Sequence, residues 1–243
     1  MSSQYYSEEK IIPDDLCDQA GNMNLVDMIN RMIEISTNHF NMSQDGDIFK
    51  NTLWVLLSWD IEIVDIPVKG KKYKFGTELL GYSSFLFARR YSIKDGDREI
   101  VKAYSIWTII DPLTRRVMRI PKDSREGIKK LKKREFDNYR PKISDLEDKG
   151  ISYDLEIEPS DIDGNLHVNN TVYLKWFFEK LNRKINFNRI KILYLKEILA
   201  QEEIEIIIDF SEDFNKAEFK EKKTGERKAM LEIYHDNSQK TSI

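Results

Sequence analysis

Residues 85–110, FLFARRYSIKDGDREIVKAYSIWTII, decide the fold class of this chain. Branched and aromatic side chains stand on both sides of Asp95-Gly96, and an Asp-Gly pair favours the tight turn whose twist matches that of paired strands. The stretch therefore predicts a long antiparallel hairpin with strands at 85–93 and 98–110. Residues 53–63 alternate with period 2, which predicts a further strand, and residues 116–120 could add another.

A helix precedes these strands, and the second half of the chain repeats the plan. Residues 24–39 carry apolar side chains at helical spacing, on a stripe formed by Leu25, Met28, Ile29, Met32 and Ile33. In the second half we expect a strand at 151–158 and a helix at 168–181, followed by strands at 190–198 and 204–208. A hairpin around Thr224-Gly225 should join strands at 214–223 and 227–235. Each half suits an α+β unit in which an antiparallel sheet wraps one helix. Helices and strands do not alternate one for one, which argues against a doubly wound fold.

The composition excludes several function classes. Of 243 residues, 40% are hydrophobic, which is enough to bury a core. The 39 Lys and Arg against 42 Asp and Glu leave a net charge of −3, which gives no case for binding nucleic acid or a membrane surface. The single cysteine, Cys17, excludes an internal disulfide framework. We see no signal peptide, transit peptide or membrane-spanning run, and we expect a cytoplasmic protein without membrane insertion.

A highly charged segment separates the two halves. We therefore expect three regions, at 1–121, 122–150 and 151–243, with the middle one a linker that contains some helix. Ile128 and Leu131 are spaced to seat one helical turn on a neighbour, while the basic side chains at 129–134 stay solvated.

The densest polar cluster is residues 161–170, DIDGNLHVNN. Asp163, Asn165 and His167 are spaced by two, so in an extended segment a carboxylate, an amide and an imidazole would face one spot. We expect the following helix to begin near Val168, where unpaired backbone N–H groups could stabilise an oxyanion. The alternative is that these residues only cap the helix and form a turn.

A second candidate is Glu197, which shares a face of the predicted 190–198 strand with Leu193 and Leu195. A carboxylate on an apolar face should have a raised pKa, which suits a base that works near neutral pH. The alternative is that Glu197 stands at the end of the strand and turns to solvent beside Glu202 and Glu203. We find no phosphate-binding loop, dinucleotide fingerprint or metal-ligand pair at helical spacing, so we expect no metal and no cofactor.

These residues resemble a known family. Residues 161–170, followed by Tyr173, Trp176 and Glu179, resemble the signature of acyl-acyl-carrier-protein (acyl-ACP) thioesterases. In the first half, residues 103–111 and 113–116 are similar to the family's strand and turn, and Ile120-Pro121 closes that block. The resemblance covers most of the chain. It implies two hot-dog domains in tandem, at 1–121 and 151–243, each with a long helix wrapped by an antiparallel sheet.

The resemblance also implies an activity, which is hydrolysis of the thioester that joins a fatty acyl chain to acyl carrier protein. This reaction ends chain elongation and releases free fatty acid. The family's Asp-x-Asn-x-His motif maps onto Asp163, Asn165 and His167, and its acidic strand residue maps onto Glu197. Ile198 stands where the family has a Cys, which argues against a thiol nucleophile here. The resemblance leaves open whether Asp163 attacks directly or Glu197 activates water, with the Val168 N–H as an oxyanion donor.

The two halves should then have different roles. We expect the catalytic residues in the C-terminal domain and the acyl chain in the N-terminal one, with candidate lining residues Met28, Met32, Leu53, Val55 and Trp107. The basic stretch 129–134 could dock the acidic carrier protein by charge complementarity, or could be a solvated linker. A homodimer is left open. Three alternatives remain: an acyl-CoA thioesterase, another hot-dog acyl-thioester enzyme such as a hydratase, and a non-catalytic acyl-binding module.

Overall fold

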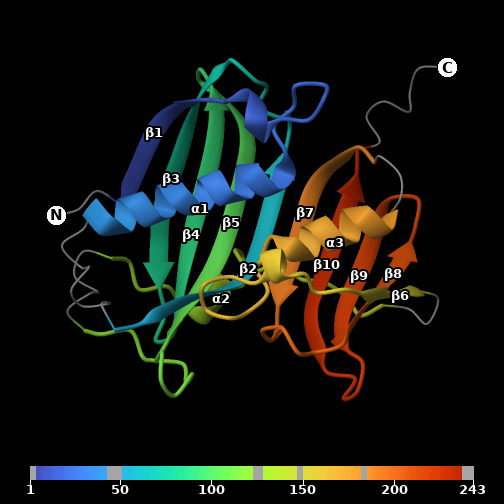
Figure 1. Cartoon of the computed structure of the whole chain (residues 1–243). Coiled ribbons are helices and arrows are strands. Elements are labelled where there is room, and N and C mark those ends of the chain that lie inside the picture. Colours follow the sequence, from blue (N-terminus) through green and yellow to red (C-terminus); the bar gives the residue numbers. More distant parts are fainter. Residues whose placement is uncertain (1–3, 43–50, 123–127, 147–149, 182–184, 237–243) are drawn as a thin grey trace. The chain divides into compact units, whose positions relative to one another are not determined.

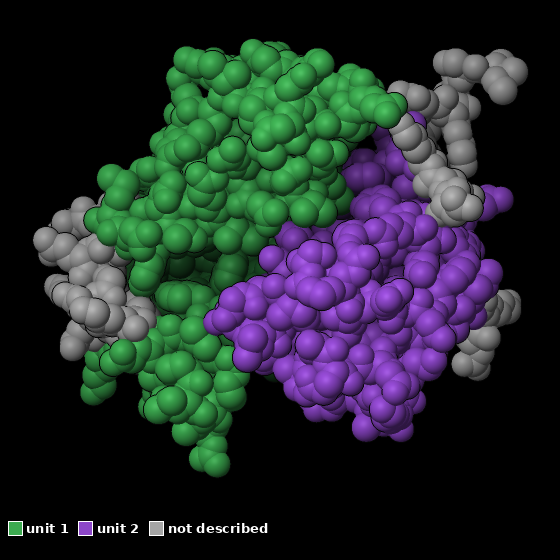
Figure 2. All heavy atoms as spheres, in the orientation of Figure 1, with its two compact units in different colours: residues 1–140 green, residues 141–243 purple. Residues whose placement is uncertain are grey.

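The computed structural model describes residues 4–42, 51–122, 128–146, 150–181 and 185–236. The chain divides into two compact units, residues 1–140 and 141–243, which Figure 2 colours separately. The division falls inside the charged segment that we predicted as a linker. Within the described residues, no helix has the length and apolar character needed to cross a lipid bilayer.

The first unit is an antiparallel sheet with one long helix across its face (Figure 1). Its strands lie in the order β1-β3-β4-β5-β2. The bounds are β1 Tyr5–Ile11, β2 Leu53–Ile63, β3 Lys72–Tyr82, β4 Leu86–Asp95 and β5 Arg98–Ile110, with helix α1 at Leu25–Met42. The predicted Asp-Gly hairpin is confirmed: Asp95 pairs with Arg98, and Gly96 has the positive φ of 59° that this turn requires.

Contacts identify which face of this sheet looks toward α1. Arg89 of β4 lies 3.1 Å from the ring of His39 in the last turn of α1, so Arg89 is on the helix-facing side. Ser105 of β5 pairs with Arg89, and the Trp107 indole N–H donates to Ser105, which places both on the same side. Most of the predicted α1 stripe is buried, with Met28, Ile29 and Met32 each 1% exposed.

A β-bulge in β2 changes the predicted facing of several residues. The pairing with β5 shifts between Leu56, opposite Trp107, and Ser58, opposite Ile106. Leu56 is therefore on the helix side with Trp107, whereas Val55 faces the other way. The even alternation that we predicted along the whole of 53–63 is wrong, because an extra residue at 57 reverses the facing.

Strands β1 and β3 were not predicted from the sequence, and the strand suggested at 116–120 does not form. The glycines of β3 weaken its strand signal, but Gly76 is needed because a Cβ there would lie 2.6 Å from the Tyr5 hydroxyl of β1. Residues 116–120 form only an isolated bridge, from Val117 to Ile110, and no strand.

The charged segment packs on the other face of the first sheet. Leu131 and Phe136, which belongs to the short helix α2 (Lys133–Phe136), are 4% and 6% exposed and cluster with Ala88 and Ile106. The main chain of Leu131 also bonds to Tyr82 of β3. Of the predicted pair, Leu131 packs in this cluster, whereas Ile128 packs against a different one that contains Tyr82 and Phe87. The two do not share a helical turn, because α2 begins only at Lys133, and residues 128–140 are part of the first unit.

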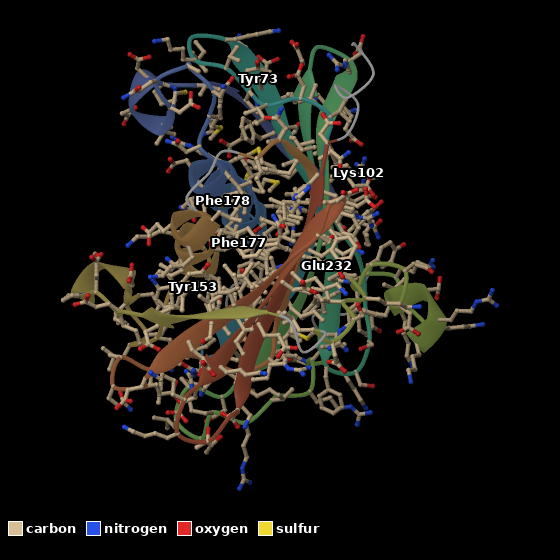
Figure 3. The ribbon with its side chains drawn as sticks, turned by 90° about the vertical axis from the view of Figure 1, so that its right-hand side faces the viewer. Tyr73, Lys102, Tyr153, Phe177, Phe178 and Glu232 are labelled. Atoms are coloured by element: carbon tan, nitrogen blue, oxygen red, sulfur yellow. The ribbon has the colours of Figure 1, made fainter. Side chains whose placement is uncertain are left out.

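The second unit has the same plan with a shorter helix (Figure 1). Its strand order is β7-β10-β9-β8-β6. The bounds are β6 Ile151–Leu155, β7 Phe187–Tyr194, β8 Ile204–Phe210, β9 Phe214–Glu221 and β10 Arg227–His235, with helix α3 at Val172–Leu181. Phe177 of α3, labelled in Figure 3, is fully buried, and its neighbour Phe178 packs against Phe187 of β7 with ring centres 5.5 Å apart. The helix begins four residues later than predicted.

Candidate functional site

Residues 163–167 form a tight turn, and our prediction of an extended segment is wrong. Ile162 and Val168 pair across the turn, the Asp163 N–H donates to the His167 carbonyl at 2.8 Å, and the Leu166 N–H donates to the Asp163 carbonyl at 3.0 Å. Leu166 adopts a positive φ of 67°, which an extended strand does not contain. The period-2 argument therefore does not apply to these side chains.

The Asp163 carboxylate holds this turn together. Its Oδ1 accepts the backbone N–H groups of Asn165 at 2.8 Å and His167 at 3.2 Å, and its Oδ2 lies 3.5 Å from the Asn165 side-chain amide. Asn165 is exposed to solvent. The turn-forming alternative thus describes the main contacts of Asp163, and the acid fixes the backbone on which His167 stands.

Asp161 and Asn169 anchor the two ends of the motif. Asp161 is 2% exposed, and its carboxylate accepts from Lys175 of α3 at 3.0 Å. The Asn169 side chain accepts both the N–H and the hydroxyl of Thr171 at 3.1 Å, which forms a turn directly before α3. These contacts tie the turn to the first residues of the helix.

The Val168 N–H is already bonded, which corrects its predicted role. It donates to the Ile198 carbonyl at 2.9 Å, and α3 starts only at Val172. A donor that is held by a protein carbonyl is not free for an oxyanion. The bond instead joins the motif to the segment that carries Glu197, since His167 and Leu199 pair in the same bridge.

Glu197 lies beyond the end of β7, so the prediction of a carboxylate on an apolar strand face is wrong. Strand β7 ends at Tyr194, and the Glu197 side chain is 39% exposed. The structure nevertheless brings Glu197 and His167 together. Glu197 Oε2 lies 3.1 Å from His167 Nε2, and the His167 side chain is only 14% exposed. Two residues 30 positions apart in the sequence thus form an acid–imidazole pair.

Three further residues are near this pair and were not predicted from the sequence: Lys228, Glu202 and Tyr173. Lys228 of β10 is 4% exposed and lies 2.5 Å from Glu202. Burial, followed by the charges of Glu202 and Glu197, raises the pKa of the Tyr173 phenol, so this buried side chain of α3 lies within reach of both carboxylates.

Other nucleophiles and metal sites receive little support. Burial, with the charge of Asp14 next, raises the pKa of the Cys17 thiol, which makes it a poor nucleophile. In the part of the chain that the structure describes, no group of three or more His, Cys, Asp or Glu side chains is arranged to hold a metal ion.

Family models match nearly the whole chain. The model described as the acyl-ACP thioesterase N-terminal domain matches residues 3–128, and the one for the acyl-ACP thioesterase C-terminal domain matches residues 144–240. Each model falls largely on one of the two structural units.

Curated relatives are plant enzymes. A chloroplastic palmitoyl-acyl carrier protein thioesterase of Arabidopsis thaliana is 27% identical over 173 residues, which are 63% of this chain and 41% of that protein. A chloroplastic oleoyl-acyl carrier protein thioesterase of Coriandrum sativum is 28% identical over 177 residues, 64% of this chain and 48% of that protein. The chain thus spans less than half the length of these relatives in the matches.

Solved structures share the fold over nearly their full length. An acyl-ACP thioesterase from Bacteroides thetaiotaomicron superposes with a TM-score of 0.79 at 19% identity, covering 96% of this chain and 98% of that one. The 12:0-ACP thioesterase from Umbellularia californica gives 0.80 at 17% identity, covering 97% and 98%. The predicted α+β fold with two hot-dog domains is confirmed, and the chain belongs to the acyl-ACP thioesterase family.

Proposed function

We propose that the protein hydrolyses the thioester of fatty acyl-ACP, releasing free fatty acid and acyl carrier protein. The observation that carries the proposal is the 3.1 Å contact between Glu197 and His167 in a chain of this family. A carboxylate beside an imidazole can move a proton between water and a leaving group, which is what hydrolysis of a thioester requires.

In the proposed reaction, water is the nucleophile. Glu197 accepts a proton from water as the water oxygen bonds to the thioester carbon. The C–S bond then breaks, and the proton passes through His167 to the departing phosphopantetheine sulfur. The Asn165 side-chain amide orients the thioester and donates a hydrogen bond to its carbonyl oxygen as negative charge develops there.

Asp163 acts in this proposal by position and does not attack the substrate. Two main-chain N–H groups already bond its Oδ1 and hold the carboxylate against the turn. A direct attack would form an acyl anhydride and take the carboxylate away from the N–H groups that it accepts. The same geometry keeps His167 in place while Glu197 works.

The acyl chain lies in the first unit in this proposal, on the helix-facing side of its sheet. Met28, Met32 and Trp107 keep their role as candidate lining residues, because all three belong to the helix–sheet interior. Leu53 and Val55 are withdrawn from that set, because both face away from Trp107.

Two substitutions separate the proposed roles. Glu197→Gln should lower the turnover of acyl-ACP by at least about 100-fold, because an amide cannot accept the proton. Asp163→Asn keeps a side-chain oxygen for the Asn165 and His167 N–H groups, so it should retain most activity, whereas Asp163→Ala should lose about 100-fold or more. An inactive but folded Asp163→Asn would point to direct attack.

Isotope labelling tests the same choice in one turnover. In water enriched with ¹⁸O, label in the Asp163 carboxylate would show an acyl anhydride that water opens at the Asp163 carbon. Attack of water on the thioester places the label only in the released fatty acid, so label in Asp163 would contradict the proposal. Parallel assays on acyl-ACP and acyl-CoA identify the carrier. Faster hydrolysis of acyl-CoA would make the protein an acyl-CoA thioesterase, and no turnover of either would indicate an acyl-binding module.

A further inference from the structure

The segment that carries Glu197 is irregular, yet its main chain is held at several points by one residue. The N–H groups of Leu195 and Lys196 donate to the Lys228 carbonyl at 2.8 and 3.0 Å. The Lys228 ammonium donates to the Glu197 carbonyl at 3.4 Å. Lys228 therefore binds the backbone next to the proposed base in two ways, through its own carbonyl group and through its side-chain ammonium.

Glu202 extends this support to the far side of Glu197. Its Oε1 accepts from Lys228 at 2.5 Å, and its Oε2 accepts the Leu199 N–H at 2.9 Å. The Glu202 N–H also donates to the Leu199 carbonyl, which closes a tight turn. Leu199 in turn pairs with His167, so the support reaches both members of the acid–imidazole pair.

The chemistry of the ammonium fits this role. Its three N–H donors have three acceptors: Glu202, the Glu197 carbonyl, and Glu226 at 3.2 Å. The Lys228 side chain is 4% exposed. Burial alone would lower the pKa of Lys228, but the hydrogen bonds that it donates to Glu202 and Glu226 outweigh burial and raise the pKa, so the ammonium stays charged.

We propose that Lys228 and Glu202 are positioning residues that hold Glu197 in register with His167. The expected loss of turnover rests on the proposed function. The expected ordering of residues 195–202 rests on these contacts alone. Neither side chain touches the substrate; each acts through the backbone that presents the Glu197 carboxylate.

The test uses four variants of the full chain. Lys228→Met removes the ammonium, and the double variant Lys228→Met with Glu202→Gln also removes the charge that would otherwise be left without its partner. Lys228→Arg keeps a positive donor. The matched control is Lys191→Met. The Lys191 side chain is 14% exposed, and its ammonium lies 3.3 Å from the carboxylate of Glu232, a residue of the same sheet that Figure 3 labels.

Kinetics on acyl-ACP give the first readout. A shift of about 1 Å in a catalytic group can cost about 100-fold, so both Lys228→Met variants should lose between about 10- and 100-fold in kcat with little change in KM. Lys228→Arg should recover most of kcat, and Lys191→Met should keep it. Wild-type kcat in a folded Lys228→Met protein, or an equal loss in the Lys191→Met control, would overturn the proposal.

Hydrogen–deuterium exchange gives a readout that needs no activity. The peptide that covers residues 195–202 should exchange faster in Lys228→Met than in the wild type. Its exchange rate in Lys191→Met should equal that of the wild type. Unchanged exchange in Lys228→Met would overturn the proposal. If the wild type hydrolyses no acyl-ACP, the proposed function fails, and the exchange result still decides whether Lys228 holds this segment.

Discussion

Glu8 on β1 shows how one carboxylate can connect a sheet edge to a helix. Its side chain accepts hydrogen bonds from Lys10 and Tyr6, both at 2.6 Å, and from Asn38 of α1 at 2.8 Å. The bond from Lys10, followed by those from Tyr6 and Asn38, lowers the pKa of Glu8 from 4.5 to about 2. The charged form of Glu8 therefore stabilises the folded first unit.

The direction of this shift predicts how stability depends on pH. Because the folded pKa is the lower one, the contribution is complete above pH 4.5 and disappears as the pH falls toward 2. Glu8→Gln should lower the free energy of unfolding at pH 7 by about 1 kcal/mol, a value reduced for solvent screening of a partly exposed group. Denaturant titrations between pH 7 and pH 2 should show the two proteins converge at the acid end.

Glu9→Gln is the matched control for this prediction. Glu9 is the next residue on β1, its side chain is 64% exposed, and it pairs only loosely with Lys72 at 3.3 Å. The free energy of unfolding of this variant should equal that of the wild type at every pH. A constant difference between Glu8→Gln and the wild type down to pH 2 would contradict the assignment.

At the same scale, the motif was predictable but its geometry was not. Residue types and spacing identified Asp163, Asn165, His167 and Glu197 as candidates, and Glu197 indeed contacts His167. Their common facing was inferred from an extended backbone. The turn itself was the stated alternative, but Leu166 enters the left-handed region, which leucine rarely does, so the sequence did not predict the path of the backbone within the turn.

At the scale of the elements, the bulge in β2 decides which residues of this strand face α1. Periodicity found this strand, both hairpins, and α1 within three residues at its C-terminal end. It could not find an inserted residue, since residues 53–57 are all apolar and fit either facing. The pairing of Leu56 with Trp107 is a tertiary fact that only the partner strand reveals.

The bulge leads to a paired prediction on acyl-chain length. Trp107→Ala enlarges the space on the helix-facing side of the first sheet, so the fatty acids released should shift toward longer chains. Val55→Ala changes the opposite face and should leave the profile unchanged. Gas chromatography of the acids released in a bacterial host measures both.

Melting temperatures of the two variants serve as the control for folding. Truncation of a buried aromatic residue costs about 3–5 kcal/mol, and Trp107 is only partly buried, so both proteins should remain folded. If the chain lengths of the released fatty acids shift as much in Val55→Ala as in Trp107→Ala, or shift in neither variant, the acyl chain lies elsewhere.

For the whole molecule, charge distribution matters more than net charge. The segment 128–140 is fixed to the first sheet through Leu131 and Phe136, while the basic residues at 129, 130 and 132–134 remain exposed. Lys129 is engaged with Glu135 at 2.7 Å, which leaves the others as the better candidates for an acidic partner. A fixed basic surface can steer a carrier protein more effectively than a loose linker.

Charge reversal tests whether this surface binds the carrier. Changing Lys130, Lys132, Lys133 and Arg134 to Glu should raise the KM for acyl-ACP and remove most of its dependence on salt. An acyl-pantetheine substrate, which lacks the acidic carrier, is the control and should be hydrolysed equally by both proteins. If salt leaves the wild-type KM unchanged, the segment is a structural connection only.

The residue after Glu197 has a consequence for the chemical durability of the protein. Ile198 is fully buried and offers only hydrocarbon where the family's motif has a sulfur atom. The remaining cysteine, Cys17, keeps its proton readily and lies in the other unit. Peroxide or an alkylating reagent would thus find no catalytic sulfur to block, and turnover should withstand oxidative conditions that silence enzymes dependent on a thiolate.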